Sequence, residues 1–142
     1  MAFHNLPAEQ IRALLQRIQR IAVVGLSPNP ARPSHGVAHA LQHFGYQIIP
    51  VRPAVDEVLG EKAYPDLRAV PGPVDLVDVF RAPEHVDAIV DDCIAMHVPA
   101  LWLQEGVVNE PAAERARRAG IMVVMDRCIY KDYRALMGGA RA

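Results

Sequence analysis

The sequence of 142 residues has neither a charge excess nor enough cysteine for a disulfide scaffold. Lysine and arginine total 15, aspartate and glutamate total 16, and the formal net charge is -1. Proteins that bind nucleic acids or anionic membranes need a large positive excess, so this balance argues against both kinds of partner. The two cysteines, Cys93 and Cys128, are too few for the disulfide framework of a small secreted domain, which favours a reducing, cytoplasmic location.

Long apolar runs are also missing. No segment approaches the roughly 20 apolar residues that a transmembrane helix needs. The first residues, MAFHNLPAEQ, lack the cationic stretch and apolar run of a signal peptide. With 51% hydrophobic and 22% charged residues, the composition is that of an ordinary globular protein, and the length predicts one domain over residues 1–142.

Several motifs of nucleotide-binding and hydrolytic enzymes are absent as well. The loop from Gly25 to Gly36 follows an apolar run but lacks GxGxxG, since Ser27 and Pro30 interrupt the pattern. A NAD site also needs an acidic residue after the second apolar run, where Arg52 stands instead, so NAD is disfavoured and NADP stays open. We find no P-loop, no HExxH, no Ser-His-Asp arrangement and no paired catalytic carboxylates, and expect no catalysis by this chain alone.

Proline, in contrast, is abundant. Twelve prolines in 142 residues exceed the usual share of about 5%. A helical bundle tolerates so many poorly, which predicts short elements joined by loops. Five of them gather at the ends of the first two apolar runs, namely Pro28, Pro30, Pro33, Pro50 and Pro53.

Short apolar runs alternate with amphipathic helical patterns along the chain. The runs are apolar on both faces and rich in β-branched residues, as is typical of strands inside a parallel sheet. Strands are predicted at 21–26, 46–51, 74–80, 100–103 and 121–125. Helices are predicted at 6–18, 35–44, 84–97, 110–119 and 130–137.

This alternation predicts an α/β fold: a single Rossmann-like, doubly wound domain with a five-stranded, mainly parallel sheet and helices on both faces. The leading helix falls within 1–19 and the Rossmann-like core within 20–130. Asn5 is predicted to cap the first helix, with Pro7 in its first turn.

The loop after the first strand is the first candidate site, because ligands of such sheets bind beyond the carboxyl ends of the strands. Free N–H groups and the helix dipole make the following helix N-terminus a natural anion site. Gly25 permits a tight turn, Ser27 offers a hydroxyl and Arg32 a guanidinium. Ser34 is predicted to cap the helix, and His35 in its first turn to be within reach of a phosphate. The alternative is a proline-stiffened connection without a ligand.

The remaining strand ends supply further candidates. Val51, Arg52 and Pro53 form an apolar edge beside a cation that would suit a purine and a phosphate, although a simple proline exit from the strand is the alternative. Phe80 and Arg81 repeat this arrangement at the third strand end.

Beyond the fourth and fifth strands the candidates differ in character. Gln104 and Gly106 lie where a ligand would be touched, whereas Trp102 is expected in the core. Cys128 is either a reactive thiolate activated by nearby cations or a structural cysteine, and the second interpretation is favoured. Cys93 lies on the apolar stripe of its helix and is expected in the core.

These stretches together resemble a known family. The matching segments are IAVVGLSPNPARPSHGVA, GYQIIPVRP, VLGEKAYPDL, VDLVDVFR, LWLQEGVVNE and AGIMVVMDRCI. In order and spacing, the chain resembles the small bacterial and archaeal CoA-binding proteins and is similar to the CoA-binding N-terminal domain of the succinyl-CoA synthetase α subunit. The resemblance implies coenzyme A or an acyl-CoA as the ligand, lying across the carboxyl ends of the strands.

The resemblance also implies roles for individual residues. It places phosphate on Gly25, Ser27 and Arg32, and adenine between Val51 and Pro53. Phe80 and Arg81 would line the path from adenosine to pantetheine, and Gln104 and Gly106 would lie near the pantetheine end. Arg52 departs from the asparagine usual in the family, and an arginine can pair with phosphate instead.

Three histidines, His35, His39 and His43, recur every four residues on one helix face. This face is opposite the apolar one and is expected to be solvated. No thiolate or carboxylate completes a ligand set, so no metal site is predicted.

The sequence therefore predicts a stand-alone CoA-binding or acyl-CoA-binding protein, acting as a carrier, sensor or regulatory module without its own catalysis. Its expected partner is the small-molecule ligand, with a homo-oligomer or a further protein partner left open. Two alternatives remain. One is an NADP-linked oxidoreductase that uses Arg32 and Arg52 on the ribose phosphate. The other is a subunit of a split acyl-CoA ligase, whose phosphohistidine and ATP-grasp domains other chains would supply.

Overall fold

A central parallel sheet organises the computed structural model, which describes residues 3–138. Its five strands lie in the order β2 (Gln47–Val51), β1 (Arg20–Val24), β5 (Leu76–Val79), β6 (Ala100–Leu103) and β7 (Met122–Val124). Every neighbouring pair is parallel. The predicted α/β fold is confirmed.

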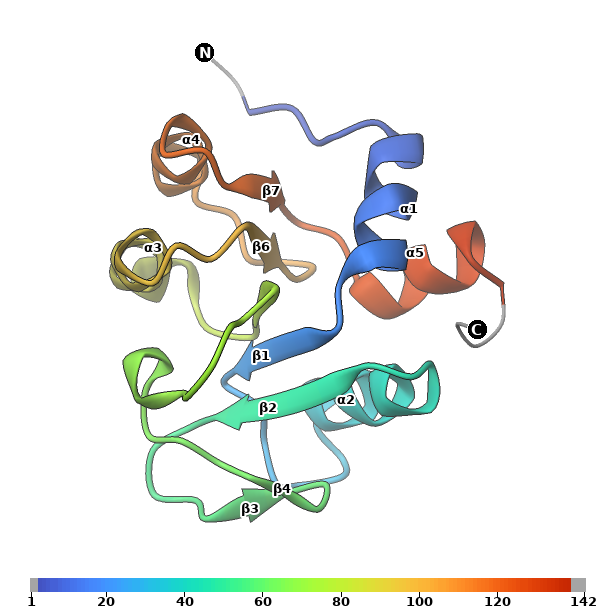
Figure 1. Ribbon diagram of the computed structural model, residues 1–142, viewed down its shortest axis with the longest axis vertical. Helices are drawn as coiled ribbons and strands as arrows, with labels where there is room; N and C mark the ends of the chain where they lie inside the picture. Colours follow the sequence, from blue (N-terminus) through green and yellow to red (C-terminus); the bar gives the residue numbers. More distant parts are fainter. Residues whose placement is uncertain (1–2, 139–142) are drawn as a thin grey trace.

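Helices cover both faces of this sheet (Figure 1). On one face lie α3 (Val86–Ala95) and α4 (Glu110–Arg118), and on the other α1 (Ala8–Arg17), α2 (Pro33–His43) and α5 (Ile129–Leu136). The chain leaves β1 toward β2 on one side and returns on the other side of β1 as β5. This reversal is a topological switch point, the place where open α/β sheets leave a crevice for ligands.

The core follows from strands that are buried on both faces. Alternate residues of β1 enter different hydrophobic clusters: Ala22 and Val24 pack under α3 and α4, and Ile21 and Val23 under the helices of the opposite face. Trp102 is fully buried, as predicted, and its Nε1 donates to the carbonyl of Arg127 at 2.8 Å. Within residues 3–138, no helix is long and apolar enough to cross a membrane.

A short insertion after β2 was not predicted. It contains the hairpin β3 (Glu57–Val58) and β4 (Glu61–Lys62), followed by the 3-10 turn η1 (Leu67–Ala69). Two residues join the hairpin strands, and both have positive φ, Leu59 at 55° and Gly60 at 78°, as a type I′ turn requires. Leucine rarely adopts a positive φ, so the sequence did not indicate a tight turn at this position.

The structure corrects two predicted helix caps. Pro7, not Asn5, occupies the N-cap of α1, and the Asn5 side chain instead exchanges hydrogen bonds of 2.9 and 2.8 Å with the backbone of Met125. Ser34 does not cap α2, because the helix begins at Pro33 with Arg32 as its N-cap. Proline suits the first helical position, where its missing N–H costs nothing, and this places Ser34 inside the first turn.

Candidate functional site

Gly25 brings three strand ends together. Its N–H donates to the carbonyl of Val51 at 2.9 Å, and its φ of +88° lies in the region that favours glycine. A Cβ at this position would lie 2.5 Å from the carbonyl oxygen of Phe80. The ends of β1, β2 and β5 therefore meet at a contact that only glycine permits.

The loop after Gly25 is braced by its own polar groups. The Ser34 Oγ accepts from the Ser27 N–H at 3.0 Å, and the Ser27 Oγ accepts from the Asn29 N–H at 3.1 Å. Both serines are buried. Each hydroxyl keeps its own O–H, so the loop is held in shape while retaining donors for a ligand.

Two adjoining cavities lie over this loop and share Gly25, Arg52 and Phe80. The first, here the loop cavity, has about 270 Å³ and includes Ser27, Arg32 and Ser34. The second, the arginine cavity, has about 530 Å³ and includes Pro53, Arg81 and His85. His85 ends η2 (Pro83–His85) and was not singled out in the sequence, where it stands within a polar turn.

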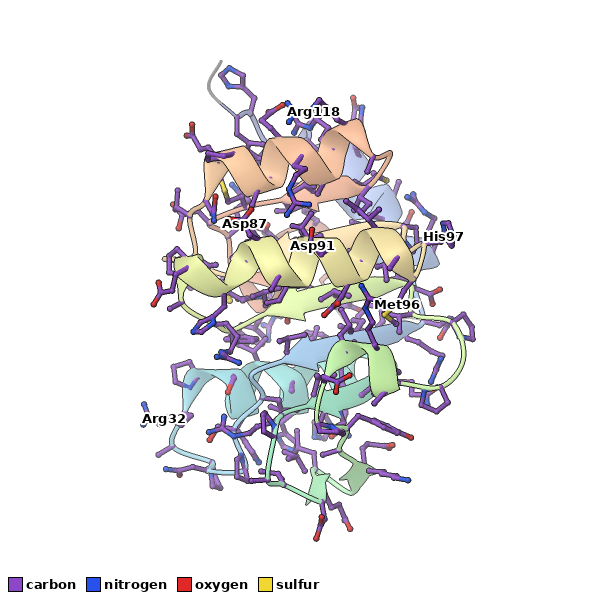
Figure 2. All side chains as sticks on the ribbon, turned by 90° about the vertical axis from the view of Figure 1, so that its left-hand side faces the viewer. Arg32, Asp87, Asp91, Met96, His97 and Arg118 are labelled. Carbon is purple, nitrogen blue, oxygen red and sulfur yellow. The ribbon has the colours of Figure 1, made fainter. Side chains whose placement is uncertain are left out.

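The positive charge in these cavities has no carboxylate partner. None of the ion pairs among residues 3–138 involves Arg32, Arg52 or Arg81. The Arg52 guanidinium contacts the carbonyl of Gly25 at 3.4 Å, and Arg32 projects from the surface at the start of α2 (Figure 2). Three unpaired guanidinium groups around adjoining cavities suit a small polyanion.

A mainly apolar recess, here the apolar recess, adjoins the arginine cavity, with which it shares Pro53, Arg81 and His85, and Asp66 and Asp92 also line it. It has about 170 Å³, and Val51, Leu67 and Ile89 are among its walls. The predicted apolar edge at Val51 and Pro53 is thus one side of a recess, and Leu67 and Ile89 of η1 and α3 also line it.

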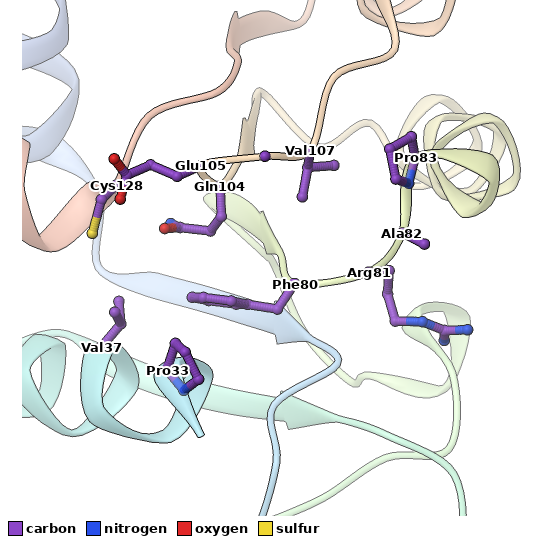
Figure 3. A pocket seen from close by; sticks show the side chains of 11 residues that line it. Pro33, Val37, Phe80, Arg81, Ala82, Pro83, Gln104, Glu105, Val107 and Cys128 are labelled. Atoms are coloured by element: carbon purple, nitrogen blue, oxygen red, sulfur yellow. The ribbon is translucent and has the colours of Figure 1, made fainter. Parts of the chain in front are cut away.

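A fourth space, the distal cavity, has about 480 Å³ and lies between the ends of β5 and β6 and the helices α2 and α5 (Figure 3). Phe80, Gln104, Gly106 and Cys128 line it, together with Val37. Figure 3 shows Cys128 and Arg81 on opposite sides, with Phe80 and Gln104 between them. The candidates from the fourth and fifth strand ends therefore face one cavity, which meets the other two at Phe80.

A buried carboxyl lies behind the distal cavity. Asp78 of β5 is fully buried, and its Oδ1 accepts from the Gln104 Nε2 at 2.6 Å. Its Oδ2 has no hydrogen-bond partner within residues 3–138. Burial raises the pKa of Asp78 from 3.8 to about 7, although the bond from Gln104 lowers it in part. Sequence reading missed this residue, and an acidic residue inside an apolar strand was the available signal.

The other sequence candidates stay outside these cavities. His35 is half-buried in the first turn of α2 but lines none of the four spaces described. The Nε2 atoms of His39 and His43 lie 3.2 Å apart, and residues 3–138 contain no group of three side chains suited to a metal. Two acidic residues that were not candidates, Asp87 and Asp91, lie on the outer surface of α3, where both pair with Arg115 (Figure 2).

The match to a family model decides the affiliation. Residues 19–134 match the model described as a CoA binding domain. The chain belongs to this CoA-binding family. The predicted resemblance is thereby confirmed, whereas the roles of individual residues stay predictions.

This CoA-binding domain corresponds to nearly the whole of some relatives and to a small part of another. It is 46% identical over 120 residues to the uncharacterized protein YneT of Bacillus subtilis, covering 84% of this chain and 89% of that protein. A hypothetical protein from Pyrococcus horikoshii, known from a solved structure, shares 33% identity with a TM-score of 0.91, covering 97% of this chain and 99% of that one. The ADP-forming acetate–CoA ligase I of Archaeoglobus fulgidus is 25% identical over 119 residues, which are 77% of this chain but 17% of the ligase.

Proposed function

We propose that this CoA-binding domain binds coenzyme A or an acyl-CoA across the carboxyl ends of its strands. The observation that carries the proposal is the set of three unpaired arginines around adjoining cavities that continue into the distal cavity. Coenzyme A has the matching form: a phosphorylated, polyanionic nucleotide at one end and a long, uncharged pantetheine arm at the other.

The ligand fits the cavities in one direction. The pyrophosphate takes the loop cavity, where Arg32 and the hydroxyls of Ser27 and Ser34 supply donors. Arg52 and Arg81 of the arginine cavity take the ribose phosphate, and the adenine enters the apolar recess beside Val51. The arm then passes Phe80 into the distal cavity toward Gln104 and Gly106.

The chain acts in this proposal as a carrier, sensor or regulatory module and not as an enzyme. The argument is chemical: the cavities supply cations, donors and apolar walls, and the sequence supplies no nucleophile–base pair. A reducing, cytoplasmic setting suits the two free cysteines, of which Cys93 is buried and Cys128 half-buried.

Thermal unfolding with a panel of ligands tests the proposal. A ligand at 100 times its Kd adds about 2.7 kcal/mol, which raises the Tm of a domain of this size by roughly 5–15 °C. We expect such a shift with CoA and acetyl-CoA and little change with NAD or ATP. A clear shift with NADP and none with any CoA species would overturn the proposal in favour of the oxidoreductase alternative.

Replacing Arg32 by alanine tests the phosphate site. Arg32 is exposed and makes no ion pair among the described residues, so Arg32→Ala should leave the fold stability nearly unchanged. CoA binding should weaken by about 1–3 kcal/mol, measured by calorimetry. The matched control is Arg118→Ala, an exposed arginine at the end of α4, far from Arg32 (Figure 2), which should not affect binding. Equal affinities of the two variants would remove Arg32 from the site.

The match to a ligase supports a second candidate, a subunit that completes an acyl-CoA ligase. This chain corresponds to only 17% of the acetate–CoA ligase, so the rest of such an enzyme would have to come from elsewhere. Purification from the native cell at low salt distinguishes the two candidates. Co-purification of a subunit with an ATP-grasp domain and ATP-dependent acyl-CoA formation would favour the ligase, and CoA binding without either would favour the carrier or sensor.

A further inference from the structure

The buried pair Asp78 and Gln104 lies where the proposed ligand would end. Asp78 faces Val23 of β1 and Trp102 of β6 in the sheet register, and neither neighbour carries a charge. Gln104 is 4% exposed, lines the distal cavity, and uses its Nε2 to bond Asp78. Among residues 3–138 its Oε1 forms no hydrogen bond, and it is not among the buried unpartnered atoms, unlike Asp78 Oδ2, so this amide oxygen is open to the cavity that Gln104 lines.

An ionised carboxylate can only accept hydrogen bonds, so Asp78 decides which way the Gln104 amide is turned. The NH₂ group must face Asp78, which directs the carbonyl oxygen away from it. We propose that Asp78 is a positioning residue that fixes the Gln104 carbonyl toward the distal cavity, where it accepts an N–H from an amide of the ligand. The inference rests on the proposed function, because the pantetheine arm of CoA carries two such amides.

The same geometry makes the orientation depend on protonation. A protonated Asp78 can donate its O–H to the Gln104 Oε1, which allows the amide to turn and present its NH₂ group to the cavity. Since burial raises the pKa of Asp78 to about 7, this change falls near neutral pH. The cavity would then offer an acceptor at higher pH and a donor at lower pH.

The surrounding charges do not set this titration. Burial raises the pKa of Asp78 and the bond from Gln104 opposes this rise, with no contribution from another charge among the described residues. Near the cavity, Lys131 of α5 pairs with Glu105, and Arg127 pairs with Asp132. Further ionisable side chains on this side are Cys128 and Arg81 at the cavity and Tyr130 and the buried Tyr133 of α5. Asp126 also lies close, since its Oδ1 accepts from the N–H of Gly106 at 2.7 Å.

Two ligands separate the arm from the nucleotide. CoA carries the arm, and adenosine 3′,5′-bisphosphate lacks the arm and one 5′-phosphate, so the change with pH in the ratio of their Kd values reports how the contribution of the arm changes. Calorimetry between pH 5.5 and 8.5 should show this contribution rising about 3- to 10-fold as pH passes 7 in the wild type, the size of one hydrogen bond. Asp78→Asn, which cannot ionise, is the matched control for the titration of the ligands' own phosphates and should show no such rise beyond theirs.

Nuclear magnetic resonance of the unliganded protein supplies a second readout. The side-chain amide signals of Gln104 should titrate together with the Asp78 carboxyl in the wild type and should be insensitive to pH in Asp78→Asn. If CoA binds but its arm contributes equally at every pH, or if both proteins respond alike, the inference is wrong while the proposed function stands. If neither CoA nor the bisphosphate binds, the proposed function itself is wrong.

Discussion

Replacing Gly25 by alanine is expected to destabilise the fold by about 2–4 kcal/mol and to abolish measurable CoA binding. The backbone at Gly25 has a φ of +88°, which strains any residue with a Cβ. The added Cβ would also lie 2.5 Å from the Phe80 carbonyl oxygen, a backbone atom that can move only if the ends of β1 and β5 separate. Urea denaturation measures the first effect and calorimetry the second.

Gly36→Ala is the matched control for stability. Gly36 lies in α2, outside the positive-φ region, and a Cβ there meets no atom of the described residues within 4 Å. Alanine should stabilise the helix by about 0.5–1 kcal/mol, because it limits the unfolded chain more than glycine does. Equal stabilities of the two variants would contradict the close approach at Gly25. Full CoA affinity in Gly25→Ala would show that the meeting of β1 and β5 does not shape the site.

The fold could be predicted from the sequence because its strands are buried on both faces. Short apolar runs separated by helical patterns, such as 21–26 and 100–103, are typical of strands in a parallel sheet. The structure places these two runs in β1 and β6. Helix ends depend on single contacts and were less accurate. Asn5 bonds Met125, 120 residues away, a partner that no local pattern identifies.

The candidate site was predictable to the extent that it depends on topology. Parallel strands bring their carboxyl ends to one edge, so candidates taken from separate strand ends, such as Arg52 and Phe80, line the same cavities. His35 was chosen from its position in a helical turn and lines none of them. Asp78 was overlooked because its partner Gln104 is 26 residues away, and only the register of β5 and β6 joins them.

The largest pH-dependent effect on stability is expected from Asp78→Asn. In the folded protein the pKa of Asp78 is raised from 3.8 to about 7, so the folded state keeps a proton that the unfolded state releases above about pH 4. A raised pKa means that the stability contributed by this group is complete below pH 4 and is lost as pH rises toward 7. Asparagine does not titrate, so the Asp78→Asn protein loses no stability at this position over this pH range.

The stability of Asp78→Asn relative to the wild type should therefore increase by up to about 1.4 kcal/mol per pH unit between pH 4 and 7 and then level off. Urea denaturation of both proteins at pH 5, 6, 7 and 8 should show a relative gain of about 2–3 kcal/mol across the series. The imperfect fit of an asparagine amide shifts the whole curve without changing its slope. Parallel curves for the two proteins would mean that Asp78 ionises as readily in the folded chain as in the unfolded one. The orientation of Gln104 would then not change near neutral pH.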